Sequence, residues 1–228
     1  MDTFRDSAHP HATHEVRVPA GAATIHADLT IPISARGLVL FAHGSGSSRF
    51  SPRNTFVAGV LNGAGLGTLL FDLLTKEEEA IDLDAGRLRF DISLLSQRLL
   101  AATDWLLAQS DMHGLRLGYF GASTGGAAAL VAAVERPKAI GAIVCRGSRT
   151  DMAAGVLSEV AAPTLLIVGE ADSQVLTWNR ESFAELRGEK RLEVIPGATH
   201  LFEEPGKLQE VARLATGWFV KHLTPSAS

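Results

Sequence analysis

The chain has 228 residues, 46% of them hydrophobic, which is enough for one α/β domain with a core on both sides of a sheet. Its 21 basic and 25 acidic residues leave no excess of cations for binding phosphates, so we expect no nucleic-acid partner. Cys145 is the only cysteine, which excludes an internal disulfide and a thiolate zinc cluster.

No apolar segment approaches the roughly 18 uninterrupted residues that a membrane helix needs. Residues 1–16 are polar and histidine-rich, without the apolar core of a secretory signal. We therefore expect a cytoplasmic protein that does not span a membrane. A single domain is predicted over residues 14–223, between flexible tails at 1–13 and 224–228.

The first two predicted strands, residues 15–18 and within 22–33, show partial alternation of polar and apolar side chains, which indicates an antiparallel sheet edge. The chain then changes to short, continuous apolar runs separated by helical segments, which is typical of buried parallel strands. These runs lie at residues 37–42, 67–73, 116–120, 139–144, 163–168 and 191–195.

Three helices are predicted between and after these strands. The clearest spans residues 91–108, where apolar side chains repeat every three or four positions. Another follows Ser123 through the small residues 127–133, and the last covers 205–223, with Pro205 in its first turn. This alternation predicts a doubly wound, mostly parallel sheet with helices on both faces. Such folds bind ligands beyond the carboxyl ends of their strands.

Residues 121–125 read Gly-Ala-Ser-Thr-Gly, a G-x-S-x-G motif where a strand runs into a helix. Its glycines leave room where larger side chains would meet the neighbouring strand and helix. The turn places Ser123 at a helix N-terminus, where amides favour negative charge on a substrate. Ser123 is therefore the predicted nucleophile and the Thr124 amide a predicted oxyanion donor. The alternative is a tight turn without chemistry.

A serine nucleophile needs a base and an orienting carboxylate later in the chain. His200 follows the last predicted strand and is the predicted base. Asp172 follows the strand at 163–168 and is the predicted carboxylate, with Glu170 and Asp151 as competitors. The structural alternative for Asp172 is a cap on the following helix.

The loop after the strand at 37–42 is rich in glycine and serine, so its backbone amides can approach a ligand. The Ser45 amide is the predicted second oxyanion donor. Arg49 in this loop and Arg146 in a later one are candidate substrate-binding residues, with a solvated helix start as the alternative for Arg49. The acidic residues 77–79 are expected in a solvated loop, with a small cover over the site as the alternative.

With the motifs HGSGSSR, GASTGG, GEAD and GATH in this order, the chain resembles the dienelactone hydrolase family of the α/β-hydrolase superfamily from about Val16 to Leu223. The resemblance implies about eight strands with the second antiparallel, a nucleophile–Asp–His triad, and no cofactor or metal. The enzymes that give the family its name carry cysteine at the elbow. With Ser123 in that place, this chain is more similar to a Ser-type relative, like short-chain carboxylesterases and thioesterases.

The predicted function is hydrolysis of an ester, thioester or lactone of a small acyl substrate through Ser123, His200 and Asp172. Two alternatives remain open on the sequence. One is a non-catalytic binding or regulatory protein on the same fold. The other is an acyltransferase that uses the same triad with an acceptor other than water.

Overall fold

The computed structural model describes residues 12–224. The predicted tails, 1–13 and 224–228, lie outside the described residues except for three positions: Ala12, Thr13, which opens the first strand, and Thr224, which follows the last helix. Within the described part, no helix is both long and apolar enough to cross a membrane.

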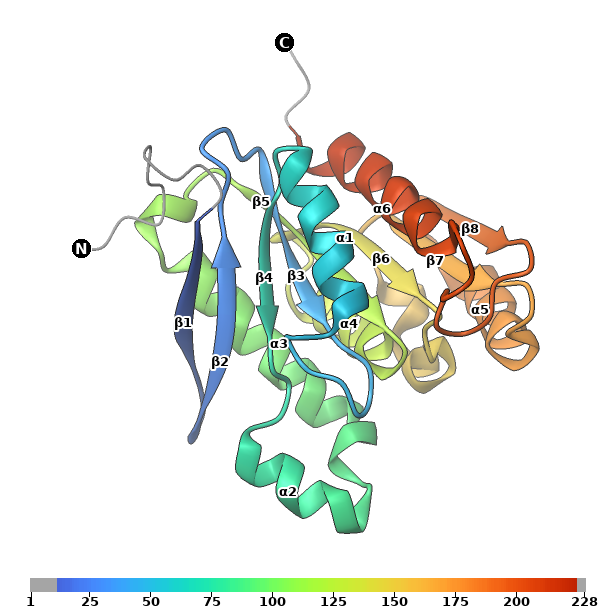
Figure 1. Cartoon of the computed structure of the whole chain (residues 1–228), viewed down its shortest axis with the longest axis horizontal. Helices are drawn as coiled ribbons and strands as arrows, with labels where there is room; N and C mark the ends of the chain where they lie inside the picture. Colours follow the sequence, from blue (N-terminus) through green and yellow to red (C-terminus); the bar gives the residue numbers. More distant parts are fainter. Residues whose placement is uncertain (1–11, 225–228) are drawn as a thin grey trace.

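Eight strands form one sheet in the order β1-β2-β4-β3-β5-β6-β7-β8 (Figure 1). β2 pairs antiparallel with both β1 and β4, and every other neighbouring pair is parallel. The predicted antiparallel edge and the predicted fold class are therefore confirmed. The strands are β1 (Thr13–Ala20), β2 (Ala23–Thr30), β3 (Gly37–Ala42), β4 (Gly67–Phe71), β5 (Arg116–Ala122), β6 (Ile140–Arg146), β7 (Thr164–Gly169) and β8 (Lys190–Ile195).

Helices cover both faces of the sheet, as predicted. One apolar core lies beneath α3, α4 and η3, and a second lies beneath α1 and α6. The helices are α1 (Pro52–Gly63), α2 (Lys76–Ala85), η1 (Leu88–Phe90), α3 (Ile92–Leu107), η2 (Ser110–Met112), α4 (Thr124–Glu135), η3 (Thr150–Glu159), α5 (Ser173–Glu185) and α6 (Lys207–Leu223).

Sequence features explain why these elements form. β3, β4 and β7 are buried along their whole length, so their continuous apolar runs suit a sheet that is covered on both faces. In α3 the side chains repeating at spacings of three and four face the core, and Asp91 caps the helix by accepting the Leu94 N–H at 3.0 Å.

Two local predictions are wrong. Pro205 does not lie in the first turn of α6, because Gly206 takes a left-handed conformation with φ 82° and the helix begins only at Lys207. The acidic residues 77–79 are not a solvated loop but the first turn of α2. Thr75 and Glu78 form a capping box there, and negative side chains suit the positive end of a helix.

Candidate active site

The turn that carries Ser123 is strained and tightly packed. Ser123 has φ 51° and ψ −123°, a region that residues other than glycine rarely adopt. A methyl group at Gly121 would lie 2.4 Å from Gly126 Cα, and one at Gly125 would lie 2.1 Å from the Ala42 carbonyl oxygen. Only glycine fits at these two positions, so the spacing of the motif follows from close contact between β5, α4 and β3.

His200 and Asp172 form a hydrogen-bonded pair, with His200 Nδ1 at 2.6 Å from Asp172 Oδ2. Asp172 also occupies the N-cap position of α5, but its side chain makes no capping hydrogen bond. Its carboxylate is therefore bonded to the His200 ring rather than to the backbone of the helix. The competing carboxylates have other partners: Glu170 accepts the Gly197 N–H at 2.8 Å, and Asp151 pairs with an arginine.

The loop between β6 and η3 contacts both Ser123 and His200. Ser123 N–H donates to the Arg146 carbonyl at 3.3 Å, and the Ser123 carbonyl accepts the Arg149 N–H at 3.0 Å. A methyl group at Gly147 would lie 3.4 Å from His200 Nδ1. No hydrogen bond joins Ser123 Oγ to His200 among the described residues, and such bonds often form only when substrate binds.

Two buried polar residues that the sequence analysis missed hold this loop. Ser148 Oγ donates to the Gly121 carbonyl at 3.2 Å, which ties the loop to the elbow. Asn179 of α5 donates through Nδ2 to the carbonyls of Ser148 and Val175, both at 2.8 Å. A single serine and a single asparagine carry no periodic signal, so nothing in the sequence pointed to them.

The two predicted oxyanion donors lie in segments next to Ser123. Thr124 follows Ser123 directly, and a methyl group at Gly44 would lie 3.0 Å from Ser123 Cβ, so the loop that carries Ser45 packs against the serine. Among the described residues, neither the Ser45 nor the Thr124 amide donates to another protein group. Both amides are thus available to a ligand.

His43 braces this oxyanion loop. Its Nδ1 donates to the Gly44 carbonyl at 2.9 Å, and its Nε2 accepts the Leu73 N–H at 3.0 Å. This arrangement requires a neutral imidazole, and burial lowers the pKa of His43 accordingly. Both ring nitrogens are used within the protein, so His43 fixes the backbone that presents Ser45.

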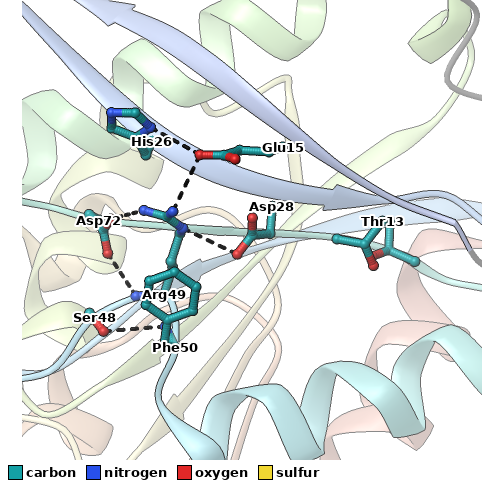
Figure 2. A network of polar contacts seen from close by, with 9 residues as sticks. Thr13, Glu15, His26, Asp28, Ser48, Arg49, Phe50 and Asp72 are labelled. Atoms are coloured by element: carbon teal, nitrogen blue, oxygen red, sulfur yellow. Dashed lines mark hydrogen bonds and ion pairs between the residues drawn. The ribbon is translucent and has the colours of Figure 1, made fainter.

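Arg49 lies among three carboxylates carried by the strands (Figure 2). Its Nη1 is 2.5 Å from Asp72 Oδ2, its Nε 3.2 Å from Asp28 Oδ2, and its Nη2 3.5 Å from Glu15 Oε1. The Arg49 backbone N–H also donates to Asp72 Oδ1 at 2.8 Å. Burial raises the pKa of Asp28, although the neighbouring Arg49 acts against that rise. This placement favours a structural role for Arg49 over the predicted contact with substrate.

A cavity of about 530 Å³ opens beside the nucleophile. Gly44, Ser45 and Thr124 line it, whereas Ser123 and His200 do not. Side chains of α2 line it as well, and Figure 1 shows α2 beyond the carboxyl end of β4. The helix therefore lines a cavity next to the elbow, and the alternative of a cover over the site stays a prediction.

Ion pairs hold α2 in place. Arg98 of α3 donates to Glu78 at 2.5 Å and to the Ala20 carbonyl at 2.7 Å. Asp82, at the other end of α2, pairs with Arg89 and accepts a backbone N–H. These ion pairs thus connect α2 to α3 and to η1.

Two residues at the end of β6 lie inside the protein. Cys145 is fully buried, as predicted, and burial raises the pKa of its thiol to about 12, which disfavours a thiolate at neutral pH. Arg146, predicted to touch substrate, is only 7% exposed. Its Nε and Nη1 have no hydrogen-bond partner within the described part of the chain.

Comparisons with known proteins agree with this architecture. A sequence model of the dienelactone hydrolase family matches residues 57–218. The crystal structure of dienelactone hydrolase from Anabaena variabilis superposes with a TM-score of 0.92 and 56% identity, over 94% of this chain and 100% of that chain. Est1E from Butyrivibrio proteoclasticus shares the fold at 14% identity, with a TM-score of 0.77 over 91% of this chain and 98% of its own.

A curated relative carries a different kind of name. The chain is 53% identical over 214 residues to a putative phosphoribosyl transferase of Mycobacterium tuberculosis. That match covers 94% of this chain but 47% of the relative. The chain therefore spans about half the length of that protein.

Proposed function

Because the chain belongs to the dienelactone hydrolase family and is thus a hydrolase, we propose that it cleaves an ester, thioester or lactone of a small acyl substrate with a serine nucleophile. Ser123 would attack the acyl carbon, with His200 as base and Asp172 as its orienting carboxylate. The observation that carries the proposal is the hydrogen bond of 2.6 Å between His200 and Asp172, made in place of a helix cap.

The reaction runs in two stages. His200 Nε2 takes the hydroxyl proton as Ser123 Oγ bonds to the acyl carbon, and the amides of Ser45 and Thr124 stabilise the resulting oxyanion. The intermediate collapses when the alcohol or thiol leaves with the proton from His200, and an acyl-enzyme remains. Water, deprotonated by the same histidine, then attacks the acyl carbon and releases the acid and the free serine.

Two features of the site support this assignment. The strained backbone at Ser123 is unfavourable for stability, and such strain is found where function requires it. Within residues 12–224, the amides of Ser45 and Thr124 also have no protein partner. Free amides suit a binding protein as well, so the strained backbone of Ser123 is the feature that separates the two roles.

The substrate is proposed to be a small neutral or acidic molecule, handled in the cytoplasm without a cofactor, a metal or nucleic acid. The name of the mycobacterial relative suggests phosphoribosyl transfer, but that name belongs to a protein about twice as long. We do not extend it to this chain. Acyl transfer to an alcohol would use the same first stage and differs only in the acceptor.

The decisive experiment is labelling by a fluorophosphonate probe, with mass spectrometry to locate the adduct. We compare the wild type with Ser123→Ala and His200→Ala. An adduct on Ser123 that both variants lose supports the activated nucleophile, and an ester panel with and without an added alcohol then separates hydrolysis from transfer. The absence of any adduct from the folded wild type would favour the binding protein.

A further inference from the structure

β8 forms one end of the sheet, and within residues 12–224 β7 is its only strand neighbour (Figure 1). The Thr164 N–H of β7 donates to the Glu189 carbonyl at 2.8 Å, just before β8 begins. In a parallel pair, every second residue of a strand directs both of its backbone groups to the same neighbour. The alternate residues that start from Glu189 therefore bond to β7. The residues between them, Lys190, Leu192 and Val194, direct their N–H and C=O groups to the open edge.

An open edge of this kind can pair with a strand of another chain. The edge at the other end of the sheet, β1, suits such pairing less well. Pro19 of β1 has no N–H to donate, which interrupts the row of backbone donors. Glu15 of β1 is also held within the chain, at 3.5 Å from Arg49. β8 is therefore the edge at which a further strand would find a continuous row of backbone partners.

The charges on β8 match those of a second, antiparallel copy. Arg191 and Glu193 lie two positions apart and so share one face of the strand, where they form an ion pair. A twofold axis at Leu192 would place each of these two side chains opposite its counter-charge in the partner. The same axis pairs Leu192 with its own copy and Lys190 with Val194, which gives about six backbone hydrogen bonds. A shift of the register by two residues would leave one of these three residues without a partner.

The surface beside β8 is balanced in charge. A groove of about 270 Å³ separates β8 from α6, and three cations line it. Each cation pairs with a carboxylate, as Arg191–Glu193, Arg213–Glu210 and Lys221–Glu189. An interface between two identical surfaces has to be self-complementary, which a single excess of one sign would prevent. The chain as a whole carries a net charge of −4, so this balanced surface is a place where two copies can approach without strong repulsion.

We propose that two copies of this chain join through β8, antiparallel about a twofold axis at Leu192, to form one continuous sheet. The occupant of the open edge is thus the β8 strand of the second copy. Arg191 and Glu193 set the register, because the pairs that they form across the axis are favourable only when Leu192 lies on it. The proposal does not depend on the proposed hydrolase activity, since β8 contains none of the proposed catalytic residues.

Sedimentation velocity over a range of protein concentrations tests this dimer and gives its Kd. The wild type should reach twice the chain mass of 24.2 kDa. Arg191→Glu and Glu193→Arg each put like charges opposite one another on both sides of the axis, so each should weaken the dimer about 10- to 100-fold. An equimolar mixture of the two variants should form a heterodimer about as tight as the wild type, because every cation then faces a carboxylate. Arg17→Glu, exposed on β1, makes the same charge change at the other edge and should leave the Kd unchanged.

The mixture separates this register from other ways of pairing. If the two variants stay monomeric when mixed, or if neither weakens the dimer alone, the proposed pairing is wrong. A wild type that is monomeric at its highest soluble concentration, or a dimer that Arg17→Glu disrupts, also overturns it. If a single variant does not fold, hydrogen exchange of the wild type followed by mass spectrometry decides. Amides of residues 190–195 should then exchange more slowly above the dimer Kd than below it, and protection confined to other segments would refute the interface.

Discussion

The backbone of Ser123 has φ 51° and ψ −123°, which costs an L-residue about 1–3 kcal/mol and glycine very little. The surrounding chain imposes this conformation. Ser123 N–H donates to the Arg146 carbonyl, and the Ser123 carbonyl accepts the N–H groups of Gly126 and Arg149 at 3.1 and 3.0 Å. Replacing Ser123 by glycine should therefore remove strain without changing the fold.

The net gain in stability is smaller than the strain energy, because glycine has more conformational entropy in the unfolded chain, which destabilises the folded protein by about 0.4–1 kcal/mol. We expect Ser123→Gly to be more stable by about 1 kcal/mol, which for a domain of this size raises the Tm by roughly 3 °C. Ser123→Ala is the matched control, because alanine loses the same hydroxyl but keeps the strain. Both variants should lose about 10⁴-fold or more in turnover.

Urea unfolding followed by tryptophan fluorescence, with thermal melting as a second measurement, gives the two free energies of unfolding. The difference in free energy of unfolding between Ser123→Gly and Ser123→Ala measures the effect of the strained backbone at position 123, since both variants lack the serine hydroxyl. If Ser123→Gly is no more stable than Ser123→Ala, the elbow stores no strain. Function would then not be what maintains this conformation.

Three further predictions concern the residues around the nucleophile. Gly125→Ala should destabilise the protein by about 3 kcal/mol in urea unfolding, because the new methyl group would lie 2.1 Å from the Ala42 carbonyl oxygen. If the variant is as stable as the wild type, the elbow relaxes around the methyl group without cost. Burial lowers the pKa of His43 below its ordinary value of 6.5. Between the two pKa values the unfolded chain therefore binds more protons than the folded protein, and the free energy of unfolding should fall as the pH drops below about 6.5 towards the folded pKa. His43→Asn should flatten that dependence between pH 8 and 5.5, and an unchanged slope would assign it to other groups. Asp172→Asn keeps a residue that suits the N-cap position but removes the carboxylate that bonds to His200, so kcat should fall about 10⁴-fold with little loss of Tm. Retained kcat would mean that Asp172 does not orient His200.

The sequence predicts most of the parallel strands well because strands such as β3 and β7 are buried along their whole length. Their apolar runs are continuous, and β3 has the predicted bounds. Strands that end in polar or small residues are longer than their apolar runs predict. β5 and β6 each extend two residues beyond the predicted end, to Ala122 and Arg146. Ser123 was predicted from the elbow motif, and Asp172 and His200 from chain order, because each follows a parallel strand at the same sheet edge.

The missed features depend on contacts between residues far apart in the chain. α2 has a weak apolar face and is held by ion pairs such as that of Arg98 with Glu78, so hydrophobic periodicity cannot reveal it. Arg49 was predicted to be available to a substrate because its partners are distant in the chain, Asp28 on β2 and Asp72 just after β4. Charge pairing across a sheet leaves no local pattern in the sequence.

The Arg49 network ties the loop that carries Ser45 to the far edge of the sheet. Carboxylates from β1, β2 and the end of β4 converge on the arginine that ends the Ser45 loop. Anyone who transplants this loop into another hydrolase would therefore have to transplant its three carboxylates as well. Exchange of the loop or of the antiparallel edge alone would break these ion pairs.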